Sequence, residues 1–239
     1  MYLKRKADAY LNAWKSDPNR SPLIIKGPRQ VGKTETIDYF AAHNYRSVVE
    51  INFVEEPKYR AITADGYGAN TIVRNISLID PAKKFIPGDT LIFFDEIQAH
   101  PDIATALKFF KIDGKYDVIC SGSMLGISYK QIESNSVGYK TDYEMRSLDF
   151  EEFLWARGYD EAVIDSMFTP LCDATPFSEV EMNVFSTAFM DYCVLGGMPA
   201  VVASHIRTGT FEGTLQLQRQ LILDYQEDLR KYAQGLAQA

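Results

Sequence analysis

One short segment constrains the fold of this chain more than any other, because residues 27–34 match the phosphate-binding loop pattern G-x-x-x-x-G-K-[ST]. The loop consists of Gly27, Pro28, Arg29, Gln30, Val31, Gly32, Lys33 and Thr34. Its two glycines let the backbone approach a phosphate closely, and the N–H groups of the loop and of the following helix point toward the anion. The motif therefore predicts a strand–loop–helix unit that binds a nucleotide.

The polar residues of the loop have predicted roles. Lys33 should reach the β- and γ-phosphates of ATP, and Thr34 should offer its hydroxyl to Mg²⁺. Glu35 follows directly and ends the predicted nucleotide-binding segment. The apolar residues 23–26 predict a strand before the loop, and residues 35–43 predict a helix after it. This context argues against the alternative, a Gly-rich turn that binds nothing.

The rest of the first 148 residues alternates between strand and helix patterns. The uninterrupted apolar run at 90–95 is typical of a central parallel strand that is covered on both faces. Further strands are predicted at 47–53, 117–121 and 139–148, and helices at 2–16, 55–63, 70–79 and 102–110. The alternation predicts an α/β domain with a parallel sheet.

The pattern changes near residues 146–149, after which only helices are predicted. Their ranges are 149–157, 160–168, 178–195, 199–206 and 210–233. We therefore expect an ATPase core over residues 1–148 and an all-helical lid over residues 149–239. The link lacks Gly-Ser or Pro-rich character, so the lid is expected to pack beside the nucleotide site. Gly196 should end one helix and Pro199 should start the next, although a nucleotide-sensing role for this turn is an alternative.

Two acids, Asp95 and Glu96, end the strand at 90–95. At the sheet edge that carries the phosphate loop, Asp95 can hold the Mg²⁺ shell beside Thr34. Glu96 can orient and polarise the water that attacks the γ-phosphate. Small-molecule kinases with this type of loop generally lack the second acid, so Glu96 favours hydrolysis over phosphoryl transfer. The alternative is a strand that merely runs into an acidic loop.

A Ser-Gly-Ser turn follows the strand at 117–121 and extends toward residues 124–126. Ser121 or Ser123 could bind the attacking water or the phosphate, and the sequence does not choose between them; a plain strand-capping turn is the alternative. A catalytic arginine is also expected for phosphoryl transfer. The candidates are Arg29, Arg146, Arg157, Arg207, Arg219 and Arg230. Arg146 is favoured because it lies at the domain junction.

Composition narrows the function classes. The net charge of −7 and the pI of about 5.1 argue against a broad basic face for nucleic acid. The three cysteines (Cys120, Cys172 and Cys193) lack metal-binding spacing and are expected to be reduced, buried thiols. No apolar run has the length of a signal peptide or membrane span. These features predict a soluble cytoplasmic protein.

Five segments together resemble the prokaryotic AAA+-like ATPases, in which an ATPase core is followed by a helical lid. They are residues 27–34, 93–98, 121–123, 147–154 and 196–199. The first two mark P-loop ATPases in general, whereas Ser-Leu-Asp-Phe-Glu-Glu-Phe-Leu at 147–154 and Gly-Gly-Met-Pro at 196–199 point to this family. The resemblance covers nearly all of the chain and implies a sheet ordered 5-1-4-3-2. It also implies Lys33 and Thr34 at phosphate and Mg²⁺, Asp95 at Mg²⁺, and Glu96 as the catalytic acid.

Two departures from the family pattern stand out. Members commonly have a proline before the Leu-Ser-Phe stretch, whereas residues 146–150 lack it and Asp149 replaces the serine. Family members usually continue into a C-terminal domain of unknown function, which would begin near Ala239. We therefore expect a missing effector domain or an unknown protein partner, and a homo-oligomer is possible.

Three functions are compatible with these motifs. The first is Mg²⁺-dependent ATP hydrolysis that drives motion of the lid. The second is a slow-turnover switch that holds ATP and signals through order and disorder near the nucleotide. The third, a small-molecule kinase, is disfavoured by Glu96 and by the absence of an arginine-rich lid.

Overall fold

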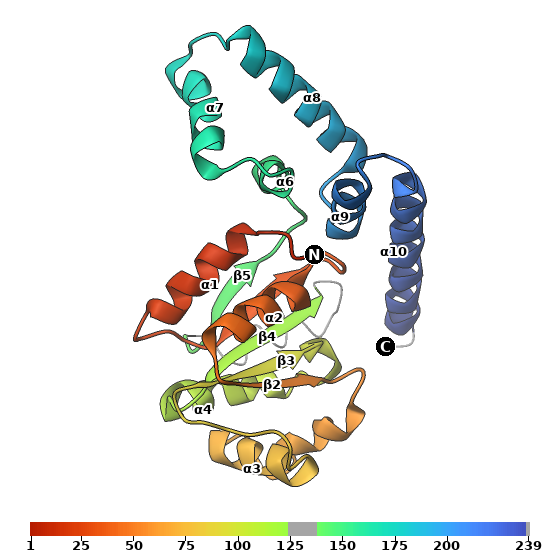
Figure 1. Ribbon diagram of the computed structural model, residues 1–239. Coiled ribbons are helices and arrows are strands. Elements are labelled where there is room, and N and C mark those ends of the chain that lie inside the picture. The colour runs from red at the N-terminus through yellow and green to blue at the C-terminus, as the bar shows by residue number, and fades with distance from the viewer. Residues whose placement is uncertain (124–137, 238–239) are drawn as a thin grey trace. The chain divides into compact units, whose positions relative to one another are not determined.

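The computed structural model describes residues 1–123 and 138–237 (Figure 1). Contacts within the chain divide these residues into two compact units. The helical unit comprises residues 1–6, 30–32 and 146–237, and the sheet unit comprises residues 7–29, 33–123 and 138–145. This division differs from the expected one in that residues 1–6 and 30–32 group with the helical segment. A functional division between residues 148 and 149 stays a prediction.

A five-stranded sheet forms the centre of the sheet unit. Its strands are β1 (Leu23–Gly27), β2 (Ser47–Asn52), β3 (Thr90–Asp95), β4 (Asp117–Ser123) and β5 (Thr141–Glu144). The order is β2-β3-β4-β1-β5, and every neighbouring pair is parallel. The predicted order 5-1-4-3-2 is therefore confirmed. All carboxyl ends of the strands meet at one edge, where a ligand site of such a sheet is built.

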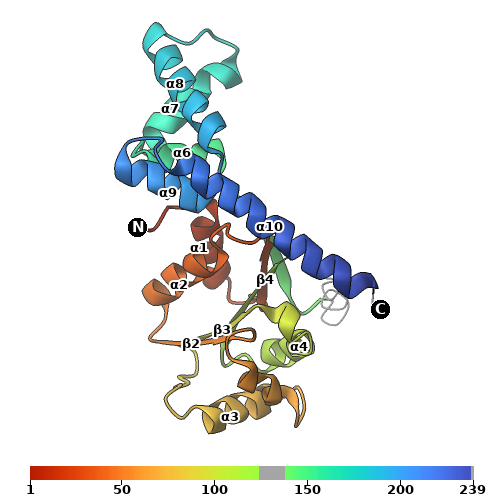
Figure 2. The same ribbon diagram turned by 90° about the vertical axis from the view of Figure 1, so that its right-hand side faces the viewer.

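Helices of the sheet unit cover both faces of this sheet. They are α1 (Lys6–Ser16), α2 (Lys33–Asn44), α3 (Ala69–Ile79) and α4 (Ile103–Asp113), with the 3₁₀ turns η1 (Pro57–Thr63) and η2 (Ile97–Ala99). Figure 2 shows α2 and α4 on opposite sides of the strands. All six residues of β3 are buried, as expected for a strand that is covered twice. Phe94 packs between Phe53 and Phe110 within the core.

Several element boundaries differ from the predicted ones for identifiable reasons. The predicted helix 2–16 begins only at Lys6, because the preceding Arg5 is held by backbone carbonyls of distant segments. The predicted strand 139–148 is confined to β5, since its partner β1 gives way to the phosphate loop beyond Gly27. By contrast, β4 extends to Ser123, which pairs with Gly27.

The helical unit contains five helices among the described residues. They are α6 (Phe150–Ala156), α7 (Glu161–Asp173), α8 (Glu179–Leu195), α9 (Pro199–Thr208) and α10 (Thr214–Ala237). Capping boxes start two of them, with Asp149 and Glu152 at α6 and Ser178 and Glu181 at α8. Their shared core includes Leu148, Phe153, Leu195, Val201 and Val202. The predicted all-helical character after residue 149 is confirmed.

The Gly196–Pro199 turn joins α8 to α9 as predicted, because Gly196 caps α8 and Pro199 begins α9. Gly197 has a further structural role. Its carbonyl accepts a hydrogen bond from the Leu148 N–H at 2.7 Å. A Cβ atom at position 197 would lie 2.0 Å from the Leu148 carbonyl oxygen. Only glycine therefore lets the segment before α6 approach this turn so closely.

The exposure of the cysteines differs in part from the expected one. Cys120 is buried in β4, but Cys172 and Cys193 are exposed on α7 and α8, so the prediction of three buried thiols is wrong for these two. Within the described residues, no cluster of three potential metal-binding His, Cys, Asp or Glu side chains exists. Nor does any helix in that part of the chain have the length and apolarity needed to cross a membrane.

Candidate nucleotide site

The phosphate loop leaves β1 and enters α2 through two residues with left-handed backbone. Gln30 has a φ of 62° and Gly32 a φ of 90°. Left-handed residues within a loop turn successive N–H groups toward a common centre, which creates a concavity that binds anions. The loop conformation therefore agrees with the phosphate-binding role that the motif predicts.

Lys33, the first residue of α2, lies over the loop that precedes it. Its Nζ donates to the carbonyl oxygens of Gly27 at 3.0 Å and Pro28 at 2.7 Å. Burial lowers the pKa of Lys33, and the negative charges of Glu96 and Asp95 partly oppose this shift. The ammonium group is thus partly desolvated and close to the loop backbone, which strengthens its attraction for a phosphate.

Asp95 is surrounded by hydrogen-bond donors at the end of β3. Its Oδ2 accepts from the Thr34 hydroxyl at 3.2 Å and from the Asn52 amide at 3.5 Å. Its Oδ1 accepts from the Glu96 N–H at 2.9 Å and from the Ser121 hydroxyl. These bonds fix the carboxylate beside Thr34. The two residues that the sequence assigns to Mg²⁺ are therefore in contact, and their oxygen atoms are the ligand type that Mg²⁺ prefers.

Glu96 occupies a backbone conformation that is rare for a residue with a side chain. Its φ and ψ are 54° and 45°, in the left-handed region. Such conformations raise the energy of the chain and cluster at functional sites. The Glu96 carboxylate accepts a hydrogen bond from the amide of Gln98 in η2. Sequence reasoning missed Gln98 and Asn52, although Gln98 lies within the run 93–98.

The register of the sheet separates the two candidate serines. Phe94 pairs with Cys120, so Asp95 lies beside Ser121. The Asp95 carboxylate accepts a hydrogen bond from the Ser121 hydroxyl. The hydroxyl of Ser123 is buried and has no hydrogen-bond partner in residues 1–123 and 138–237. Ser123 is therefore the better candidate for a contact to water or phosphate. Residues 124–126, the predicted extension of this turn, lie outside the described range.

Two further residues of the predicted site, Glu35 and Arg146, are exposed. Glu35 is exposed in the first turn of α2. Arg146, the favoured arginine, is exposed, and its carbonyl accepts a hydrogen bond from Arg5 at 2.6 Å. Its predicted contact with a transition state stays a prediction.

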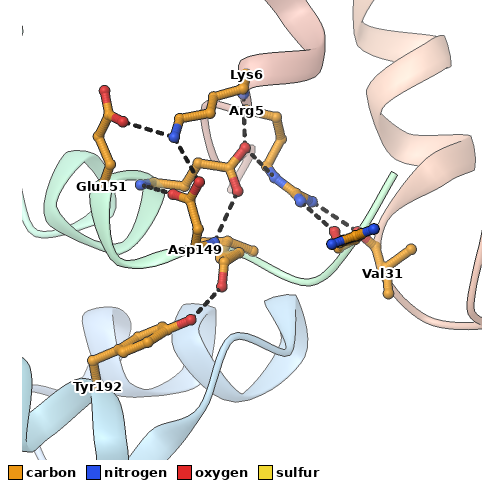
Figure 3. A network of polar contacts seen from close by, with 9 residues as sticks. Arg5, Lys6, Val31, Asp149, Glu151 and Tyr192 are labelled. Atoms are coloured by element: carbon orange, nitrogen blue, oxygen red, sulfur yellow. Dashed lines mark hydrogen bonds and ion pairs between the residues drawn. The ribbon is translucent and has the colours of Figure 1, made fainter. Parts of the chain in front are cut away.

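A polar network in the helical unit includes one residue of the phosphate loop (Figure 3). Arg5 donates to the carbonyl of Val31 at 2.7 Å and forms an ion pair with Glu152 at 3.2 Å. Nearby, the Tyr192 hydroxyl donates to the Leu148 carbonyl at 2.8 Å. Sequence reasoning did not identify Arg5, because it lies outside every recognised motif.

A family model described as an AAA domain matches residues 19–154, more than half of the 239-residue chain. The chain belongs to this family. The match begins before β1 and ends within α6, so it includes the phosphate loop and Asp95. The AAA domain of this chain is therefore of the nucleotide-binding P-loop type.

Several solved structures are similar to this chain at low sequence identity. Caenorhabditis elegans PCH-2 is 12% identical with a TM-score of 0.45, over 83% of this chain and 59% of that chain. DnaA from Aquifex aeolicus bound to AMPPCP is 13% identical with a TM-score of 0.47, over 91% and 64%. ORC1 from Aeropyrum pernix in complex with DNA is 12% identical with a TM-score of 0.42, over 64% and 48%. This chain spans less than two thirds of the length of each of these three proteins. No curated protein matches it.

Proposed function

We propose that this AAA domain binds Mg-ATP and hydrolyses it to ADP and phosphate. The observation that carries the proposal is the contact of Thr34 with Asp95, directly before Glu96. Thr34 and Asp95 would hold Mg²⁺, which when bound neutralises charge on the phosphates. Lys33 would exchange its bonds to the loop carbonyls for bonds to the β- and γ-phosphates.

Glu96 acts in this proposal as the general base. It orients the attacking water and accepts one of its protons while the water oxygen bonds to the γ-phosphorus. The bond between that phosphorus and the bridging oxygen of ADP breaks, and its electron pair stays with ADP. Ser123, whose buried hydroxyl has no hydrogen-bond partner among the described residues, would hold the water or a γ-phosphate oxygen.

A slow-turnover switch is the second candidate, and one contact favours it. The Gln98 amide is bound to the Glu96 carboxylate, so the base must leave or share this partner before it acts. Turnover would then be low in the isolated chain and would rise when an unknown partner, a further domain or another copy of the chain completes the site.

Phosphate release by the purified protein tests the proposed hydrolysis. We expect release from ATP with Mg²⁺ and none above background when EDTA removes the metal. Asp95→Asn should raise the Mg²⁺ concentration needed for half-maximal release, because the amide is a weaker ligand than the carboxylate. Equal release with and without Mg²⁺ would contradict the assignment, whereas Mg-ATP binding without release would favour the switch.

The helical segment from residue 149 onward is proposed to respond to the nucleotide as a lid. The grouping of residues 30–32 with this segment supports the proposal, since part of the loop packs with it. We expect a non-hydrolysable ATP analogue to increase amide protection both in residues 20–123 and in residues 150–230, measured by hydrogen exchange. If protection changes in the first range alone, the lid proposal is wrong.

A further inference from the structure

Arg5 is a buried cation that joins three distant segments. Its side chain lies in the helical unit with 4% exposure. The guanidinium donates to the carbonyls of Val31 and Arg146, and it pairs with the Glu152 carboxylate. The N-terminal segment, the phosphate loop and the start of α6 therefore meet at one side chain, as Figure 3 shows.

The bond to Val31 fixes a peptide group of the phosphate loop. A trans peptide is planar, and its C=O and N–H point in opposite directions; the described chain contains no cis peptide bond. When Arg5 holds the Val31 carbonyl on one side, the Gly32 N–H must point to the other. Arg5 also lies close behind Gly32, because a Cβ atom at that position would be 3.6 Å from its Nη1.

Arg5 is itself held in place by Glu152. The Glu152 carboxylate accepts from the backbone N–H groups of Lys6 at 2.7 Å and Asp149 at 3.1 Å. Glu152 is also the third residue of α6, where it completes the capping box. A buried ion pair contributes little net stability once its desolvation is counted. The main effect of this pair is therefore geometric: Glu152 holds Arg5 in the position from which Arg5 binds the loop.

We propose that Arg5 is a positioning residue for phosphate binding, which orients the Gly32 N–H toward the nucleotide by holding the Val31 carbonyl. This inference rests on the nucleotide site proposed above. It adds a residue outside the loop motif to that site. If Arg5 has this role, the segment before α1 contributes to phosphate binding.

The test compares Arg5 with its neighbour Lys6, a matched cation. The side chain of Lys6 is half-exposed and pairs with Asp149 at 2.6 Å and Glu151 at 2.7 Å, both at the start of α6. Calorimetric titration with Mg-ADP should give roughly tenfold weaker binding for Arg5→Gln, the effect of one lost charged hydrogen bond. Arg5→Lys should lie between, because an ammonium cannot hold two carbonyls and a carboxylate in the same plane. Lys6→Gln should stay within about twofold of the parent, as expected for an exposed ion pair.

A spectroscopic measurement separates orientation from general destabilisation. In protein labelled with ¹⁵N-glycine, Mg-ADP should shift the Gly32 amide proton downfield in the parent and in Lys6→Gln. The shift should shrink in Arg5→Lys and Arg5→Gln at temperatures where both remain folded. If Arg5→Gln does not fold, Arg5→Lys and the parent spectrum still decide the matter.

The outcomes distinguish this inference from the function on which it rests. Parental Mg-ADP affinity and an unchanged Gly32 shift in Arg5→Lys would overturn the role of Arg5 while leaving the nucleotide site intact. A parent protein that binds Mg-ADP without any shift of the Gly32 amide would also overturn it. Failure of the parent to bind Mg-ADP would overturn both.

Discussion

Lys33→Ala is expected to weaken Mg-ATP binding by roughly ten- to a hundredfold, the amount that one or two hydrogen bonds from a charged group contribute. Lys33 supplies a full positive charge at the loop, and its burial makes that charge more effective than an exposed one. The loss should be measurable by calorimetric titration of Mg-ATP, with thermal unfolding recorded to confirm that the variant is folded.

The pH dependence of binding provides a second signature of Lys33. Burial lowers its pKa below the ordinary lysine value, and only the protonated form attracts phosphate. The affinity of the parent for Mg-ATP should therefore fall at alkaline pH, and the fall should begin at a lower pH than it would if the lysine were exposed. This fall should be absent in Lys33→Ala.

Lys115→Ala is the matched control for Lys33. The Lys115 ammonium donates hydrogen bonds to the side chains of Asn70 and Asp113, and all three residues are far from the loop in sequence. Removal of the Lys115 side chain should therefore leave the affinity for Mg-ATP unchanged. Equal affinity of Lys33→Ala and the parent would mean that residues 27–34 do not bind phosphate.

Glu96→Gln is expected to retain Mg-ATP binding and to slow hydrolysis by about two to four orders of magnitude, the range of a lost general base. The amide keeps the shape of the side chain and removes its basicity. Single-turnover measurement of phosphate release, at ATP concentrations above the dissociation constant, separates this chemical effect from binding. Glu179→Gln is the control, since Glu179 is exposed in the first turn of α8 and belongs to no predicted site; this variant should hydrolyse ATP at the parental rate.

A Glu96→Gln variant that hydrolyses ATP like the parent would reduce Glu96 to an acid at the end of a strand. Loss of Mg-ATP binding together with hydrolysis would instead indicate that Glu96 shapes the site. The left-handed backbone of Glu96 is compatible with such a structural role.

Much of the fold could be predicted because its signals are local. The loop motif, the apolar run of β3 and the alternation of strands with helices each lie within short windows of sequence. Together with the family resemblance, they predicted the parallel sheet and the order 5-1-4-3-2 correctly. The contact of Thr34 with Asp95 also followed, since Thr34 lies in the first turn of the helix that follows β1 and its loop, and Asp95 ends β3 at the same edge of the sheet.

The contacts that sequence reasoning missed depend on long-range geometry. Arg5 binds partners 26 and 141 positions away, and nothing in its neighbourhood marks it as buried. The choice between Ser121 and Ser123 required the strand register, because the two serines lie on the same face of β4 and a shift of two residues would place Ser123 beside Asp95. Gln98 was visible in the sequence, but its bond to Glu96 depends on the left-handed turn between β3 and η2.

The pairing of β1 has a consequence for how this protein acquires its site during synthesis. β1 carries the phosphate loop, yet Leu23 pairs with Ile119 in β4 and with Thr141 in β5. Contacts between such distant residues form late, because a long segment of chain must first be enclosed. β1 therefore gains both of its neighbouring strands only after the ribosome has synthesised β5. Nucleotide affinity of a nascent chain would consequently arise in one late step, and ATP would stabilise the completed sheet rather than guide its assembly.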